Sequence, residues 1–223
     1  ETIGILKGTG SGITVKYPES PTERIQAAIM FLRLKGLEEK AKTYQGQDNF
    51  SDVGRMWDEG RAMLAFLKAN PELGWLGDGG GMFRPLEVVT RSEYAKVLLS
   101  VLGYEQGIDF EWKDVDSFAS EKGIEIPGEG QSGFTVRDMA SATVKALNTH
   151  VKGTEKTLIE VLVEKGIVTA KKAEATGLYK PLPDVDTPPP EVLSAGFVEG
   201  SRIKVLFSEP VSADRKELYE VNE

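Results

Sequence analysis

The sequence contains no cysteine and a single histidine, His150. This scarcity excludes a disulfide framework and cysteine-based zinc sites, and it leaves serine–histidine catalysis with no candidate base but His150. His150 follows an apolar helical stretch in a polar segment, which is typical of a solvated loop residue. No apolar run approaches the roughly eighteen residues that a membrane-spanning helix needs. The net charge of −8 argues against nucleic-acid binding, because phosphate neutralisation requires a basic surface.

The chain is nevertheless rich enough in apolar residues to fold. Its 223 residues are 40% hydrophobic and 28% charged, a balance that indicates a globular protein rather than a disordered one. This length allows one large domain or two small ones with cores of their own.

Three short patterns recur along the first 150 residues. An aromatic-x-Asp-Val tetrad occurs as Phe-Ser-Asp-Val at 50–53 and as Trp-Lys-Asp-Val at 112–115. A Gly-x-Gly turn occurs at 8–10, 77–79 and 128–130. Each turn precedes an arginine near an expected helix start. These arginines are Arg24, Arg91 and Arg137. The shared order predicts an internal repeat.

The second repeat is the most complete. Apolar residues at helical spacing predict a helix over 56–69, with Trp57 on its buried stripe. A glycine-rich loop follows, and then Thr90 and Glu93 form the Thr-x-x-Glu pattern of a capping box before a second helix. The first repeat lacks the opening helix and is expected to be truncated, while the third has a shorter loop.

The remaining segments predict a different organisation. Thr154 is expected to cap a helix, a short helix follows over about 170–176, and the proline-rich segment 180–191 predicts an extended linker. Alternating residues at 202–208 predict a half-buried strand. The expected domains are repeats at 1–153 (about 1–45, 46–107 and 108–153), a helical appendix at 154–179, the linker, and a partial β-module at 192–223.

The repeats resemble S-layer homology repeats of bacterial cell-surface proteins. The resemblance is carried by Phe-Ser-Asp-Val at 50–53, Gly-Asp-Gly at 77–79, Phe-Arg-Pro at 83–85 and Thr-Arg-Ser-Glu at 90–93. It implies a mainly α fold with three helix–loop–helix units in pseudo-threefold order. The segment 204–211 is similar to the first strand of immunoglobulin-like modules, which implies a partial β-module after the helices.

The resemblance also implies a function. Members of the family hold surface proteins to the bacterial wall by binding secondary cell-wall polysaccharide, which is often pyruvylated. The expectation is therefore a non-enzymatic, extracellular anchoring module that needs no cofactor. The alternative is a self-assembling surface-layer or fibre subunit, since the truncated repeat and the unpaired strands each lack a piece that a second chain can supply.

The predicted glycan site centres on the second repeat. Arginine binds a carboxylate through two parallel hydrogen bonds, and glycine-rich loops expose backbone donors. The expected binding residues are Arg91, Gly77, Asp78, Gly79, Trp75, Arg84, Arg24 and Arg137. The alternative for Arg91 is an internal salt bridge with an acid such as Asp52. Trp112 is expected to be structural.

Other chemistries fit the sequence poorly. The glycine-rich loop lacks the Gly-Lys-Ser/Thr ending of a phosphate-binding P-loop. Asp114-x-Asp116 and Asp184-x-Asp186 do not continue with the spacing of a calcium-binding EF-hand. No pair of carboxylates shows the pattern of a glycosidase cleft. The sequence thus predicts no catalytic residue and no metal site, and it predicts that Asp52 and Asp114 cap the helices after them.

Overall fold

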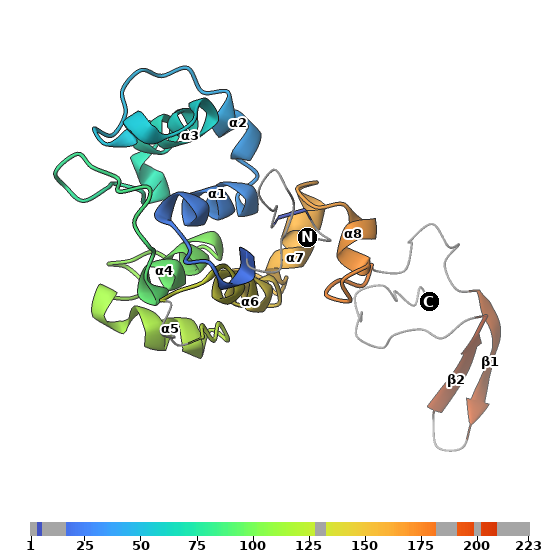
Figure 1. The fold of residues 1–223 in the computed structure, drawn as a ribbon. Coiled ribbons are helices and arrows are strands. Elements are labelled where there is room, and N and C mark those ends of the chain that lie inside the picture. The colour runs from blue at the N-terminus through green and yellow to red at the C-terminus, as the bar shows by residue number, and fades with distance from the viewer. Residues whose placement is uncertain (1–3, 6–16, 128–132, 182–190, 199–201, 209–223) are drawn as a thin grey trace. The chain divides into compact units, whose positions relative to one another are not determined.

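A computed structural model describes residues 4–5, 17–127, 133–181, 191–198 and 202–208. The chain divides into two compact units, Glu1–Lys180 and Pro181–Glu223. The protein is mainly helical, with eight α-helices and a small antiparallel sheet among the described residues (Figure 1). No helix in these ranges is long and apolar enough to cross a membrane.

The first unit contains all eight of these helices. They are α1 (Arg24–Leu34), α2 (Glu38–Lys42), α3 (Asp58–Ala69), α4 (Arg91–Val101), α5 (Val115–Glu121), α6 (Val136–Leu147), α7 (Leu158–Glu164) and α8 (Ala170–Glu174). Single 3-10 turns lie at η1 (Tyr17–Glu19), η2 (Val53–Arg55), η3 (Pro71–Leu73) and η4 (Trp112–Asp114). Helix α4 packs against α1, α5 and α6, while α2 packs on α3 and the chain continues through α7 to α8.

The mainly helical class predicted from the sequence is confirmed, but the pseudo-threefold order is not shown. The Gly-x-Gly turns at 8–10 and 128–130 lie outside the described residues, so the repeat pattern can be followed only in part. The predicted division into repeats, appendix and linker stays a prediction, and most of the linker also lies outside the described residues.

Helix α4 shows how local sequence sets a helix boundary. The Thr90 hydroxyl accepts a hydrogen bond from the Glu93 backbone N–H at 3.2 Å, and the Glu93 carboxylate accepts one from the Thr90 N–H at 2.8 Å. This is the predicted capping box, and it supplies partners for backbone donors that a helix start leaves free. At the other end, Gly103 has φ +92°, a left-handed conformation that ends the helix.

Removal of this cap should destabilise the protein measurably. We expect Thr90→Ala to lower the free energy of unfolding by about 1 kcal/mol, measured by urea denaturation. Thr169→Ala is the matched control, because Thr169 precedes α8 but its side chain makes no capping hydrogen bond. The control should change the free energy by less than about 0.5 kcal/mol. Equal losses in the two variants would contradict the capping role of Thr90.

Two predicted positions along the helices are wrong. Helix α3 begins at Asp58, so Trp57 precedes the helix and is 46% exposed instead of lying in the core. Its ring lies over Gly60, where an added Cβ would stand 3.0 Å from the indole. Helix α7 is capped by Thr157, whose N–H and hydroxyl both donate to the Glu160 carboxylate, and not by Thr154.

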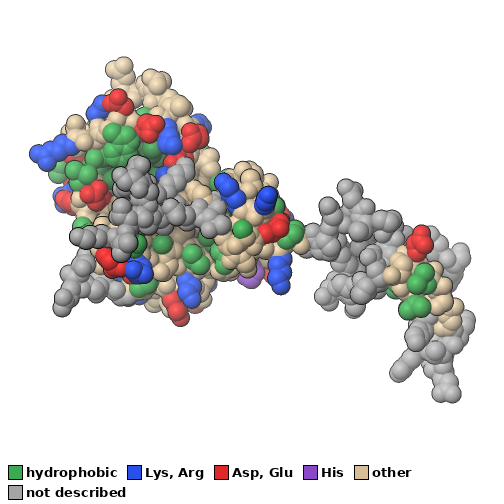
Figure 2. All heavy atoms as spheres, turned by 45° about the vertical axis from the view of Figure 1, so that its right-hand side comes forward, with side chains coloured by type: hydrophobic (Ala, Val, Ile, Leu, Met, Phe, Trp, Pro, Cys, Tyr) green, Lys and Arg blue, Asp and Glu red, His purple; other side chains and the backbone are tan. Residues whose placement is uncertain are grey.

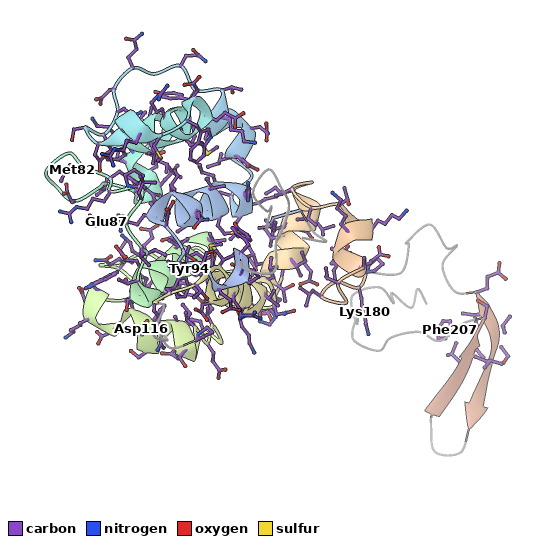
Figure 3. The ribbon with its side chains drawn as sticks, in the orientation of Figure 1. Met82, Glu87, Tyr94, Asp116, Lys180 and Phe207 are labelled. Atoms are coloured by element: carbon purple, nitrogen blue, oxygen red, sulfur yellow. The ribbon has the colours of Figure 1, made fainter. Side chains whose placement is uncertain are left out.

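The core of the first unit lies between α4 and its neighbours. Tyr94 of α4, labelled in Figure 3, is fully buried. Its hydroxyl lies 2.7 Å from the Thr143 hydroxyl of α6. The Thr143 hydroxyl also donates to the Met139 carbonyl at 2.7 Å, so both buried hydroxyl groups have partners. On the outside, acidic and basic side chains are interspersed over the face seen in Figure 2.

The second unit contains a β-hairpin. Strands β1 (Val192–Val198) and β2 (Arg202–Phe207) pair antiparallel, from Val192 opposite Phe207 to Val198 opposite Arg202. The register shifts between Val192 and Ser194, which marks a bulge. The strand predicted from alternation at 202–208 is thus present. Its immunoglobulin-like character stays a prediction.

Candidate functional site: a groove between α1 and α4

The glycine-rich loop after η3 is held by its own side chains. The Asp78 carboxylate accepts hydrogen bonds from the N–H groups of Gly80 at 2.8 Å and Met82 at 3.1 Å, and from the Arg84 guanidinium at 3.2 Å. These bonds, the Gly80 amide first, lower the pKa of the Asp78 carboxyl. Asp78 and Arg84 therefore close the loop on itself.

The tetrad aspartate fixes the end of the same loop. The Asp52 carboxylate accepts hydrogen bonds from the backbone N–H of Phe83 at 3.0 Å and of Arg84 at 2.7 Å. Arg84 has φ +59°, a left-handed conformation that is uncommon for a residue with a side chain. Neither Asp52 nor Asp114 makes a side-chain capping bond to the helix after it, so the predicted capping role of both is wrong.

A groove of about 310 Å³ lies beside this loop. Its volume is at the lower end of the range for small-ligand sites. Side chains from α1, from the segment after η3, from α4 and from the start of η4 form its walls. The lining residues are Arg24, Phe31, Leu73, Gly74, Trp75, Leu76, Gly77, Val89, Glu93, Lys96, Val97, Ser100, Gln106 and Trp112.

Two tryptophans give the groove aromatic surface. Trp75 packs edge-on against Phe31 with ring centroids 5.6 Å apart, and it stacks on Phe83 at 5.8 Å. These contacts hold the half-buried ring in one orientation. Trp112 is 44% exposed, so a ligand that contacts its ring would remove apolar surface of the ring from water. The groove thus contains one aromatic ring held by its neighbours, Trp75, and one solvent-exposed ring, Trp112.

Three charged residues line the groove: Arg24, Glu93 and Lys96. The Arg24 guanidinium pairs with the Glu93 carboxylate and also donates from Nε to the Phe83 carbonyl at 3.0 Å. The second Glu93 oxygen accepts from Thr90, so both oxygens of this carboxylate are occupied. Among the described residues, no acid lies within salt-bridge distance of Lys96.

The structure distributes the predicted glycan-binding residues over several places. Arg24, Trp75 and Gly77 line the groove, whereas Asp78 and Arg84 pair within the loop. Gly79 has φ +80° at an exposed position of that loop. Whether any of these residues binds a glycan stays a prediction.

The two remaining arginines, Arg91 and Arg137, are not among the residues that line the groove. Arg91 lies 3.6 Å from the Asp116 carboxylate of α5, which also accepts from the Ser92 hydroxyl at 2.6 Å. The internal salt bridge considered as an alternative for Arg91 is therefore present, with Asp116 as its acid. Arg137 donates from Nε to Glu19 at 2.9 Å at an exposed position.

The groove also contains Lys96, which the sequence patterns did not single out, and Trp112, for which they predicted a structural role. Both positions carry weak sequence signals, because a lysine on an amphipathic helix and an aromatic residue in a repeated tetrad are usually structural. Lys96 and Trp112 line the same groove only because α4 and η4 pack next to each other in the folded chain. No cluster of three potential metal ligands occurs in the part of the chain that the structure describes.

Comparison with protein-family models gives one match. Residues 83–167 are similar to the N-terminal region of X-prolyl dipeptidyl aminopeptidase PepX. This segment covers fewer than half of the 223 residues and includes α4 to α7. Comparison with curated proteins and with solved structures gave no significant match.

This match overturns the resemblance to S-layer homology repeats. It points to a peptidase-associated domain, so the predicted wall-anchoring function is corrected and the alternative of a surface-layer subunit has no support. The physical reason lies in the motifs themselves. Asp52 bonds to a loop backbone and Thr90 caps a helix, and such local hydrogen bonds suit any helix–loop–helix segment. The wall polysaccharide as partner and the extracellular location remain untested predictions.

Proposed function

We propose that the helical unit is a non-catalytic binding domain that holds a short peptide in the groove between α1 and α4. The observation that carries the proposal is the pair of tryptophans, Trp75 and Trp112, in one groove of small-ligand size. Seven of the groove residues lie within the segment similar to the peptidase region. They are Val89, Glu93, Lys96, Val97, Ser100, Gln106 and Trp112.

Peptides that contain proline suit this surface. Extended proline-containing segments bind to grooves lined with aromatic side chains, because their restricted backbone loses little entropy on binding. Trp75 is held by Phe31 and Phe83, so the protein also loses little freedom there. X-prolyl dipeptidyl aminopeptidase is, by its name, an enzyme that acts on X-prolyl ends, which supports proline as the residue against the rings.

The groove residues support binding without cleavage. A serine nucleophile needs a base hydrogen-bonded to its hydroxyl, and within the described residues the Ser100 hydroxyl makes no hydrogen bond to Lys96 or to any other side chain of the groove. The one acid of the groove, Glu93, already accepts hydrogen bonds from Arg24 and Thr90. His150, the sole histidine of the chain, is exposed and does not line the groove.

Calorimetric titration of the full chain with short peptides tests the proposal. We expect Ala-Pro-Ala-Ala to bind more tightly than Ala-Ala-Ala-Ala, because the proline ring adds contact with the tryptophans. Trp112→Ala should weaken the binding by about tenfold, the loss typical of an exposed aromatic anchor. Mass spectrometry after prolonged incubation should show uncleaved peptide.

Trp57→Ala is the matched control. Trp57 is as exposed as Trp112 and also stands at the start of a helical segment, but it lies outside the groove. The control should bind peptide like the wild type. Failure of all peptides to bind, equal affinity of Trp112→Ala and wild type, or binding of neutral oligosaccharides alone would overturn the proposal. Cleaved peptide would overturn its non-catalytic part.

A further inference from the structure

The charged groups of the groove leave one cation available. Arg24 and Glu93 are engaged with each other, and each has a further hydrogen bond to the backbone. Lys96 is half-buried on α4, and its ammonium makes no ion pair or hydrogen bond with any described residue. Two cations and one carboxylate line the groove, so it carries an excess positive charge in a protein whose net charge is −8.

A hydroxyl donor lies next to this cation. Ser100 follows Lys96 by four residues on α4, a spacing that places the two side chains on one face of a helix. Both residues line the groove, and the Ser100 hydroxyl makes no side-chain hydrogen bond within the described residues. An ammonium and a hydroxyl side by side match the acceptor oxygens of a carboxylate.

We propose that Lys96 and Ser100 form a carboxylate-binding subsite, so that the groove selects peptides with a negative charge near the residue held by the tryptophans. This inference rests on the proposed peptide-binding function. The carboxylate has two sources in a peptide, the C-terminus and an acidic side chain. In both cases a single carboxylate binds the half-buried Lys96 ammonium and compensates for the hydration that this ammonium lost on burial.

The state of Lys96 in the free protein supports this subsite. Burial, and then the neighbouring Arg24 guanidinium, lower the pKa of the Lys96 ammonium, while Glu93 acts in the opposite direction. The remaining lining residues are uncharged, so no other charged group in the groove acts on the Lys96 ammonium. A bound carboxylate would raise the pKa of Lys96 towards its ordinary value.

Matched peptide pairs test the subsite by calorimetry. One pair is N-acetylated Ala-Pro-Ala with a free or an amidated C-terminus, and the other is N-acetylated, amidated Ala-Pro-Asp or Ala-Pro-Asn. We expect one acidic member to bind about tenfold more tightly than its neutral partner. The pair that shows the difference identifies the source of the carboxylate. Lys96→Met should abolish the difference in affinity between the acidic and the neutral member of that pair.

The pH dependence adds a second readout. The acidic peptide should bind more weakly as the pH rises through the lowered pKa of Lys96, since the ammonium loses its charge while the carboxylate keeps its own. The neutral peptide and the Lys96→Met variant should show no such change. Lys145→Met is the matched control, because Lys145 is an exposed helical lysine outside the groove, and it should keep full discrimination.

The outcomes separate the two proposals. Equal binding of acidic and neutral peptides to the wild type would overturn the subsite and leave the peptide-binding function standing. Discrimination that persists in Lys96→Met would also overturn it. Absence of binding by every peptide would overturn the peptide-binding function itself, and the subsite with it.

Discussion

Phe83→Ala is expected to lower the free energy of unfolding by about 3–5 kcal/mol, the usual cost of removing a buried phenylalanine ring. Phe83 is 1% exposed, and its ring contacts Phe50 at 5.1 Å and Trp75 at 5.8 Å between centroids. The Arg24 guanidinium lies over the same ring at 5.5 Å. The substitution therefore leaves a cavity where the loop, α1 and the groove meet.

Urea denaturation of Phe83→Ala and of a control in the same loop measures this effect. Val88→Ala is the control, since Val88 is 46% exposed and its truncation leaves no buried cavity. The control should change the free energy of unfolding by less than about 0.5 kcal/mol. A loss below about 1 kcal/mol for Phe83→Ala would show that the ring is not part of a tightly packed core.

Gly77→Ala is expected to cost about 2 kcal/mol or more, because two penalties act at one position. Gly77 has φ +73°, a left-handed conformation that disfavours residues with a Cβ. An added Cβ would also stand 2.5 Å from the Met82 carbonyl oxygen and 3.0 Å from the Phe50 ring. That carbonyl accepts the Asp78 N–H at 2.9 Å, so it cannot move without breaking the loop.

Gly79→Ala is the control that distinguishes the backbone penalty of a left-handed residue from the steric penalty of the added Cβ. Gly79 has φ +80°, but no atom lies within 4 Å of the position of an added Cβ. The control should cost about 1 kcal/mol, the backbone term alone. The difference between the two free energies of unfolding then measures the steric contact with Met82. Equal costs would show that the loop can rearrange around residue 77.

The boundaries of α4 were predictable because they depend on neighbours in sequence. The capping box of Thr90 and Glu93 and the left-handed Gly103 need only residues within one helical turn. Trp57 was assigned to the wrong place for a related reason. Helical spacing includes it in a helix predicted to start at residue 56, but α3 begins two residues later, at Asp58, and spacing alone cannot locate that start.

The resemblance to S-layer homology repeats was wrong because its motifs describe only local structure. Its motifs record hydrogen bonds that form within a loop or at a helix start, such as Asp52 with the backbone of Arg84. Several folds need these local arrangements, so their order along the chain did not identify a family. The similarity over residues 83–167 points instead to a peptidase-associated region.

The sequence by itself determined the mainly helical class, the capped start of α4 and the lack of cysteine chemistry, because composition and local backbone preferences decide these. Only the tertiary structure decided that Trp75, Lys96 and Trp112 line one groove and that Arg91 pairs with Asp116. Residues far apart in the chain meet only when α1, α4 and η4 pack together. No local sequence pattern predicts these contacts, because they result from the packing of several helices.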